Sequence, residues 1–439
     1  MSGTSMDGID GALLETDGTE HLIKPLGEIS LAYDPAFKVL LKSTEFAIKH
    51  CKGDLQQAAA FYPQAIHTYL TNELNCSPSH VEGEIAALAT YLDKNNRNNK
   101  NQSEETITLE KVIQHSTLLH SIVVKNLLAQ TAFTADQIDV IGYHGQAMYH
   151  QPDQKISVIV GDGQYLADLT GIVVVNDFRS RDIQLGGQGA PFAPLYHQAL
   201  AIKDNKIPVA VVNCGGIANV TFINSSDPLA LIAFDTGAGN NLIDALVKLR
   251  THGQESMDKD GKYGRKGKVN EQVLKALFDK AILKNGQNYF FVKPPKALDA
   301  RDVTLIVELN TLSLEDACAT LAAFTAESIV KSLDWINPPW PQHWILTGGG
   351  WHNPVIRQEL NQRLNQKFKD KLKIETADEA GWNSHAMEAQ IFAYLAVRSL
   401  QNKPLSVPGT TGVPYPVSGG CVFIPSEKSI IKREEPNAT

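Results

Sequence analysis

The stretch Leu231–Asp244, Leu-Ile-Ala-Phe-Asp-Thr-Gly-Ala-Gly-Asn-Asn-Leu-Ile-Asp, decides the fold. Four apolar residues lead directly into Asp235, two glycines follow, and an amphipathic segment begins at Asn241. This order predicts a buried strand, a glycine turn and the start of a helix. A carboxylate at the carboxyl end of such a strand faces the crevice in which open α/β sheets bind ligands. Asp235 is therefore a candidate catalytic base, although a helix cap would use the same residue type.

The composition excludes several classes of protein. The chain has 439 residues, 43% of them hydrophobic and 20% charged, which is typical of a globular protein large enough for two domains. A net charge of -8 without a basic block argues against nucleic acid as a partner. No apolar run approaches the roughly 18 residues of a membrane span. The first lysine is Lys24, so we predict no signal peptide. Five scattered cysteines without a CxxC pair argue against disulfides and zinc and favour the cytoplasm.

Two turns of small residues indicate an internal duplication. The first, Gly3 to Gly8, leads into an apolar strand, and its amides and hydroxyls are suited to hold a phosphate. Asp7 is suited to hold Mg²⁺ through water, although a plain hairpin turn has the same composition. The second turn, Cys214-Gly-Gly216, lies between the two strands of Pro208–Ile223. We therefore expect two similar domains, 1–206 and 207–439, with a cleft between them.

Two further segments carry polar residues at predicted strand ends. His144 and Gln146 follow the apolar run Ile138–Ile141, and an isolated histidine in such a place is more often structural than functional. The run Asn176–Asp182 contains two arginines and two aspartates. These residues would form a plain ion-pair network, or grip a carboxylate or phosphate, for which guanidinium suits best.

The last third of the chain adds one glycine turn and one helix. The strand Trp344–Leu346 is followed by three glycines and the helix Pro354–Phe368, an order that lets a planar base or ribose lie against the backbone. A helix is predicted over Met387–Leu400, and Glu388 at its start is ordinarily a solvated residue.

The region between residues 37 and 130 reads as helical with one interruption. Apolar periodicity predicts helices over Phe37–Lys49, Leu55–Leu74 and Leu109–Gln130. The segment Asp93–Glu105 contains no apolar residue, so we expect a mobile polar insertion.

Taken together, these motifs resemble those of the anhydro-N-acetylmuramic acid kinase family, within the sugar kinase and actin-like ATPase superfamily. The matching stretches follow the family's order over nearly the whole chain: SGTSMDGID (Ser2–Asp10), HGQ (His144–Gln146), DFRSRDIQLGGQGAP (Asp177–Pro191), NCGGIAN (Asn213–Asn219), FDTGAGN (Phe234–Asn240), DKDGKYGRKGKV (Asp258–Val269), Thr347–Asn353 and Met387–Ala389.

The resemblance implies an α/β protein made of two actin-like, ribonuclease H-like domains, with ATP, Mg²⁺ and sugar in a cleft between them. It implies hydrolytic opening of 1,6-anhydro-N-acetylmuramic acid together with phosphorylation of O6, giving N-acetylmuramic acid 6-phosphate and ADP in cell-wall amino-sugar recycling. By the same resemblance, Asp235 is the base that deprotonates the attacking water.

The resemblance also implies the remaining site residues. Asp7 is the implied metal ligand. The sugar is implied to contact His144, Gln146, Arg181 and Glu388, with Arg181 suited to its lactyl carboxylate. ATP is implied to contact the residues of three turns: Gly3, Thr4, Ser5, Met6, Asp7, Gly8, Ile9, Asp10, Gly215, Gly216, Gly348, Gly349 and Gly350.

Departures from the family pattern leave alternatives open. The family usually has threonine where this chain has Ala147, which leaves room for another anhydro sugar such as levoglucosan as substrate. Family members usually carry several residues before the position of Met1 that form a first strand, so we hypothesise a misassigned start or a truncated chain. Loss of that strand would also fit a non-catalytic actin-like nucleotide-binding protein. The family suggests a homodimer.

Overall fold

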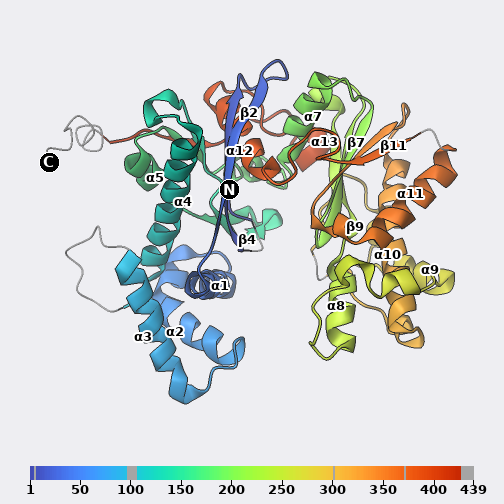
Figure 1. The fold of residues 1–439 in the computed structure, drawn as a ribbon, viewed down its shortest axis with the longest axis horizontal. Helices are drawn as coiled ribbons and strands as arrows, with labels where there is room; N and C mark the ends of the chain where they lie inside the picture. The colour runs from blue at the N-terminus through green and yellow to red at the C-terminus, as the bar shows by residue number, and fades with distance from the viewer. Residues whose placement is uncertain (4–5, 96–105, 300–301, 370–371, 427–439) are drawn as a thin grey trace. The chain divides into compact units, whose positions relative to one another are not determined.

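The computed structural model describes residues 1–3, 6–95, 106–299, 302–369 and 372–426 (Figure 1). The chain divides into two compact units. Unit 1 comprises residues 1–190, 386–406 and 416–439, and unit 2 comprises residues 191–385 and 407–415. None of the helices in the described ranges has the length and apolar character that a bilayer crossing requires.

The division differs from the expected boundary at residue 206. The helix α7 (Ala193–Lys203) belongs to unit 2, and α12 (Met387–Leu400) returns to unit 1. The reason is packing, because the buried side of α12 contacts β1 (Gly8–Thr16) and β3 (Ile141–Gly142). A single cut in the sequence therefore cannot describe the two units.

Unit 2 is built on one five-stranded mixed sheet. Its strand order is β11-β10-β7-β8-β9, in which β7, β8 and β9 are successively antiparallel and β10 and β11 run parallel to β7. This is the ribonuclease H-like arrangement expected for each half of the chain. The elements of unit 2 besides α7 are β7 (Val209–Cys214), β8 (Ile217–Ile223), β9 (Ile232–Ala238), α8 (Asn241–Arg250), α9 (Glu271–Asp279), α10 (Leu314–Lys331), β10 (His343–Thr347), α11 (Pro354–Phe368), β11 (Lys373–Thr376) and α13 (Pro408–Thr411).

The core of unit 2 lies between this sheet and α10. Most side chains of α10 are buried, as expected of a helix that is apolar on nearly every side. Ser313 caps its first turn by accepting a hydrogen bond from the Asp316 N–H (3.0 Å). In Figure 1 the sheet lies between α7 with α13 on one side and α10 with α11 on the other. The strand ends that carry the glycine turns are thereby held on a rigid support.

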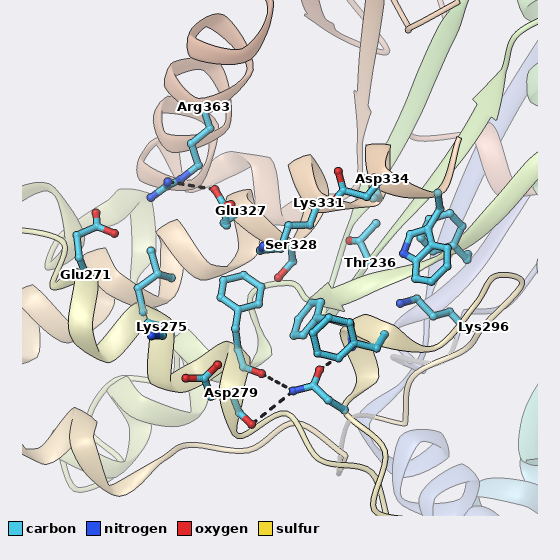
Figure 2. A pocket seen from close by; sticks show the side chains of 18 residues that line it. Thr236, Glu271, Lys275, Asp279, Lys296, Glu327, Ser328, Lys331, Asp334 and Arg363 are labelled. Atoms are coloured by element: carbon cyan, nitrogen blue, oxygen red, sulfur yellow. Dashed lines mark hydrogen bonds and ion pairs between the residues drawn. The ribbon is translucent and has the colours of Figure 1, made fainter. Parts of the chain in front are cut away.

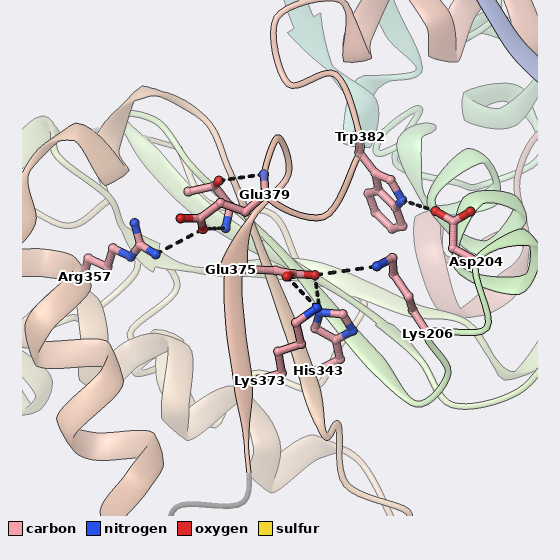
Figure 3. A network of polar contacts seen from close by, with 9 residues as sticks. Asp204, Lys206, His343, Arg357, Lys373, Glu375, Glu379 and Trp382 are labelled. Atoms are coloured by element: carbon pink, nitrogen blue, oxygen red, sulfur yellow. Dashed lines mark hydrogen bonds and ion pairs between the residues drawn. The ribbon is translucent and has the colours of Figure 1, made fainter.

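A buried ionic cluster joins the edge of this sheet to the end of α7 (Figure 3). Glu375 on β11 contacts His343 Nε2 (2.6 Å), Lys373 Nζ (2.7 Å) and Lys206 Nζ (3.6 Å). Burial opposes ionisation of Glu375, but the hydrogen bonds from Lys373 and His343 prevail and lower its pKa. The cluster therefore fixes the edge strand with a fully partnered charge.

The described residues of unit 1 form three small sheets with helices around them. β1 forms an antiparallel pair with β2 (Ile23–Ala32), β4 (Gln146–Gln151) pairs with β5 (Ile156–Val160), and β6 (Val174–Asn176) lies between β3 and β12 (Cys421–Phe423). Its helices besides α12 are α1 (Pro35–His50), α2 (Leu55–Asn72), α3 (Pro78–Asn95), α4 (Leu109–Thr131), α5 (Gly163–Thr170) and α6 (Ser180–Gln184). Helices α1, α2 and α4 confirm the three predicted, whereas α3 was not predicted. Of the predicted insertion 93–105, residues 93–95 end α3 and the rest lies outside the described residues.

A cavity of about 590 Å³ lies beside β1 in unit 1. In unit 2, β7 pairs with both β8 and β10, whereas among the described residues of unit 1 no strand is hydrogen-bonded to both β1 and β3. Beside β1, Asp10 N–H donates to Met1 O (2.8 Å), and a single bridge joins Ser2 to Ile9. The cavity walls come from β1, α4, α12 and residues 137–143, and include Leu13, Val124, Leu127, Ala393 and Val397.

Candidate active site

Asp235 occupies β9 and is held by one later segment of the chain. Its carboxylate oxygen Oδ2 accepts the N–H of Leu298 (2.8 Å), its own N–H donates to Lys296 O (3.0 Å), and the Tyr289 hydroxyl donates to its main-chain oxygen. Burial raises the pKa of Asp235 to about 6, against the lowering effects of the Leu298 N–H and the Lys296 charge. A fixed carboxylate with a pKa near neutrality is suited to accept a proton in catalysis.

The two glycine turns at the carboxyl ends of β7 and β9 are joined by main-chain hydrogen bonds. Gly239 N–H donates to Gly216 O and Asn240 N–H donates to Gly215 O, both at 2.9 Å. A Cβ on Gly239 would lie 2.0 Å from Gly215 O, whereas one on Gly216 would have Asn241 Cβ at 3.7 Å as its nearest neighbour. The backbone at residues 215 and 216 therefore faces open space and is able to receive a phosphate group.

The third glycine turn follows β10, which pairs in parallel with β7. Gly348 has φ +90°, and a Cβ there would lie 2.5 Å from Asn213 Oδ1. A Cβ on Gly350 would lie 2.5 Å from Cys214 Sγ, while one on Gly349 would meet no heavy atom within 4 Å. Unit 2 thus brings Gly348–Gly350 against the end of β7, beside the turn at Gly215, with an open backbone surface at Gly349.

We expect Gly239→Ala to abolish this arrangement of turns. The new methyl group would overlap a backbone oxygen, which cannot move away as a side chain can, so the variant should lose roughly 3 kcal/mol of unfolding free energy. Thermal unfolding with and without ATP measures the effect. Gly83→Ala is the control, because its Cβ lies in open space on α3 and should stabilise that helix by about 1 kcal/mol. Equal behaviour of the two variants would contradict the expectation.

The N-terminal turn of unit 1 is tied to the segment that carries His144. Ser2 Oγ donates to Gly145 O (2.9 Å) and Gln146 Nε2 donates to Gly3 O (2.7 Å). Gln146 is fully buried, and within the described residues its Oε1 has no hydrogen-bond partner, which is unusual for a buried polar atom. The segment at residues 145 and 146 therefore supports the turn and keeps one acceptor available.

The predicted phosphate-turn residues differ in exposure. Thr4 and Ser5 lie outside the described residues, and the side chains of Met6 and Ile9 are buried in the core of unit 1. Asp7 is exposed and its Oδ1 lies 3.5 Å from Lys38 Nζ. Gly3, Gly8 and Asp10 are partly buried. Across the described ranges no three His, Cys, Asp or Glu side chains gather as a metal site, so a cation at Asp7 would need oxygen ligands from water and phosphate.

His144 pairs with an arginine that the sequence did not single out. Its Nδ1 lies 2.8 Å from Gly145 O and its Nε2 lies 3.0 Å from Arg179 Nη2. The pKa of His144 is held well below its ordinary value, mainly by burial and further by the charge of Arg179. A neutral imidazole that donates through Nδ1–H and accepts at Nε2 satisfies both contacts. His144 therefore orients Arg179 rather than serving as a proton donor.

Arg179 is fixed from several sides. Its Nη1 donates to Gly189 O (2.6 Å), and Asp182 Oδ1 accepts the N–H of the same glycine (2.7 Å). Burial lowers the pKa of Arg179 to about 10, opposed by Glu388 and Asp182, so the group stays charged at neutral pH. Arg181, in contrast, is exposed on α6. The arginine that meets His144 is thus two positions before the one selected from the sequence.

Glu388 completes the group of charges in unit 1. Its side chain is exposed in the first turn of α12, yet the surrounding protein limits hydration of the carboxyl. The pKa of Glu388 is raised, mainly by this desolvation and further by the charge of Asp10, while the charge of Arg179 opposes the change. His144 and Arg179 therefore form a polar pair, and Glu388 acts on Arg179 through its charge. A guanidinium held in this way can bind a sugar with a negatively charged substituent.

A second cavity, of about 610 Å³, lies in unit 2 among β9, α9, α10 and α11 (Figure 2). Phe234 and Thr236, the neighbours of Asp235, line it. Figure 2 shows Lys296 at its edge, with the nitrogen directed toward aromatic side chains. Sequence reasoning missed this lysine; its position directly after two prolines marked a loop but gave no partner.

Glycine turns at strand ends beside a fixed carboxylate are what a phosphotransferase needs in order to bind a nucleotide through backbone amides and to activate a nucleophile. A model of the anhydro-N-acetylmuramic acid kinase family matches residues 92–425. The chain belongs to this family.

Individual relatives agree along nearly their whole length. The chain is 37% identical over 421 residues to the anhydro-N-acetylmuramic acid kinase of Rhodospirillum rubrum, covering 96% of this chain and 92% of the relative. It is 38% identical to that of Zymomonas mobilis, covering 96% and 97%. Among solved structures, component A of (R)-2-hydroxyglutaryl-CoA dehydratase from Acidaminococcus fermentans has 11% identity and a TM-score of 0.35, covering 64% of this chain and 85% of that chain, a similarity too distant to support a conclusion.

Proposed function

We propose that this chain uses ATP to open 1,6-anhydro-N-acetylmuramic acid with water and to phosphorylate O6, giving N-acetylmuramic acid 6-phosphate and ADP. Membership of the family supports the reaction class and the substrate. The observation that carries the chemistry is Asp235, a carboxylate fixed in the middle of β9 with a pKa of about 6. Such a group is largely ionised at neutral pH and ready to accept a proton.

The proposed reaction joins hydrolysis and phosphoryl transfer. Water attacks C1 of the sugar and gives a proton to Asp235, while the bond from C1 to O6 breaks. O6 then attacks the γ-phosphorus of ATP, and the bond from that phosphorus to the β-phosphate oxygen breaks to release ADP. Phosphoryl transfer of this kind depends mostly on positioning and on neutralisation of charge.

We propose separate roles for the two groups of residues. The turns at Gly215–Gly216 and Gly348–Gly350, together with residues Gly3–Asp10, would bind ATP through their backbone. Mg²⁺ would neutralise charge on the phosphates near Asp7. Gln146, Arg179 and Glu388 would bind the sugar, with Arg179 as the partner of its lactyl carboxylate, and His144 would orient Arg179. Arg181 remains the alternative arginine.

The test is coupled ADP release with 1,6-anhydro-N-acetylmuramic acid, with levoglucosan and without sugar. We expect turnover on the amino sugar. Turnover on levoglucosan alone would move the chain to the alternative substrate, which no finding favours. ATP binding without turnover on either sugar would favour the non-catalytic alternative. The cytoplasmic location and the homodimer remain proposals, the latter open to sedimentation analysis.

A further inference from the structure

One lysine of unit 2 is held in a cage of aromatic rings beside Asp235. The Nζ atom of Lys296 lies 4.3 Å from the ring centroid of Tyr289, 5.5 Å from that of Trp335 and 5.8 Å from that of Phe234. It donates a hydrogen bond to Tyr289 O (2.9 Å), and the whole residue is only 9% exposed. Lysine is almost never buried to this degree without a compensating partner, and here aromatic faces and a carbonyl supply the compensation.

The segment that carries Lys296 also holds Asp235. Tyr289 and Leu298, at either end of this segment, both donate hydrogen bonds to Asp235, and Lys296 accepts the Asp235 N–H. Lys296 and Leu298 are buried, while Ala297 between them is exposed, so the two buried side chains flank an exposed one in this segment. The hydrogen bond from Lys296 Nζ to Tyr289 O ties the two parts of this segment that contact Asp235 to each other.

The charges of the two residues act on each other. Burial lowers the pKa of Lys296 to about 8, and Asp235 opposes this change. The other titratable group in contact with Asp235 is Tyr289. Its pKa is raised well above the ordinary value, mainly by burial and further by the charges of Asp235 and Asp302. Tyr289 is therefore neutral over the working pH range, and Lys296 is the cation among the described residues that acts on Asp235.

We propose that Lys296 is a positioning residue for Asp235: it anchors the Tyr289–Leu298 segment in the aromatic cage, so that the Leu298 N–H holds the carboxylate, and its charge favours the ionised form. This inference rests on the proposed role of Asp235 as the base. The inference assigns a role in the reaction to Lys296, a residue that lines the cavity of unit 2 next to Asp235.

The test is the pH dependence of kcat and kcat/KM for Lys296→Met, measured by coupled ADP release. We expect kcat to fall about tenfold, and the acidic limb of the profile to move up by about one pH unit. KM for ATP should not change. A purely structural role would lower activity through loss of folded enzyme and leave the shape of the pH profile unchanged.

Two further variants give the controls. Lys331→Met removes a lysine that lines the same cavity and lies over an aromatic ring (5.2 Å from the Phe278 centroid) but is exposed and outside the segment around Asp235, so its profile should match the wild type. Lys296→Arg keeps the charge and should restore the position of the acidic limb. It also serves as the test if Lys296→Met does not fold.

The proposal is overturned if the acidic limb of Lys296→Met stays at the wild-type pH, or if Lys331→Met shifts it equally. It is also overturned if Lys296→Arg fails to restore the limb while remaining folded. Failure of the proposed function has a different signature: Asp235→Asn would keep its turnover, and the acidic limb would then report another group.

Discussion

Asp235→Asn is expected to lower kcat on the amino sugar on the order of a thousandfold, because removal of a general base costs about 10²- to 10⁴-fold. Asparagine has nearly the same shape, and its side-chain oxygen can still accept the Leu298 N–H, so the site should stay folded. Steady-state kinetics measure the loss, and calorimetry should show ATP binding unchanged. Asp334→Asn is the control, since Asp334 forms an exposed ion pair with Lys367 (3.6 Å).

The same substitution should stabilise the protein at alkaline pH. The folded-state pKa of Asp235, about 6, lies above its ordinary value of 3.8, so the folded protein disfavours the charged carboxylate. The cost to stability is fully present above pH 6, is at most about 3 kcal/mol, and disappears as the pH falls below 3.8. Asp235→Asn should therefore raise the melting temperature at pH 8 and have little effect near pH 4. An equal rise in melting temperature at pH 8 and at pH 4 would contradict a raised pKa of Asp235 in the folded protein.

Arg179→Met should lower kcat/KM for the amino sugar about a hundredfold, because a charged hydrogen-bonding group contributes roughly 1.5–3 kcal/mol. The guanidinium is held by Gly189 O and His144, so its remaining N–H groups are already oriented to bind a carboxylate. Arg179→Lys keeps the charge without the guanidinium and should recover only part of the loss. KM for ATP should be unaffected in both variants.

Arg181→Met should be compared with Arg179→Met, because the sequence had favoured Arg181 as the arginine that binds the sugar. Arg181 is exposed on α6, so its removal should cost less than that of Arg179. A larger loss in Arg181→Met than in Arg179→Met would restore the choice made from the sequence. Thermal unfolding of each variant separates loss of binding from loss of folding.

Much of the fold was predictable because its signals are local. Pro354–Phe368 and Met387–Leu400 are confirmed as α11 and α12 with the predicted bounds. Asn353 caps α11 by accepting the Val355 N–H (3.0 Å), and a proline stands in its first turn. The helix α3 was missed because few of its side chains are buried and Gly83 interrupts its apolar pattern.

Some residues of the candidate site could likewise be predicted from local sequence, and others could not. Asp235 and the glycine turns were predictable because an apolar run followed by a carboxylate and glycines is a pattern of adjacent residues. The predicted strand end at Asp235 was wrong, since β9 continues through Gly237 to Ala238. The partners of Asp235 were not, since Leu298 acts through a backbone N–H that carries no sequence signal and comes from 63 positions later. The choice between Arg179 and Arg181 depends on α6 beginning at Ser180, a boundary of the kind that sequence patterns fix poorly.

The cavity beside β1 gives unit 1 a particular response to compression. Its walls include leucine and valine side chains as well as Asp10, Glu15, Lys24 and Asp139, so the space of about 590 Å³ is only partly apolar. Hydrostatic pressure favours whichever state has the smaller volume, and unfolding removes internal voids. Pressure therefore acts on the packing of α4 and α12 against β1, in the unit that carries Arg179 and Glu388.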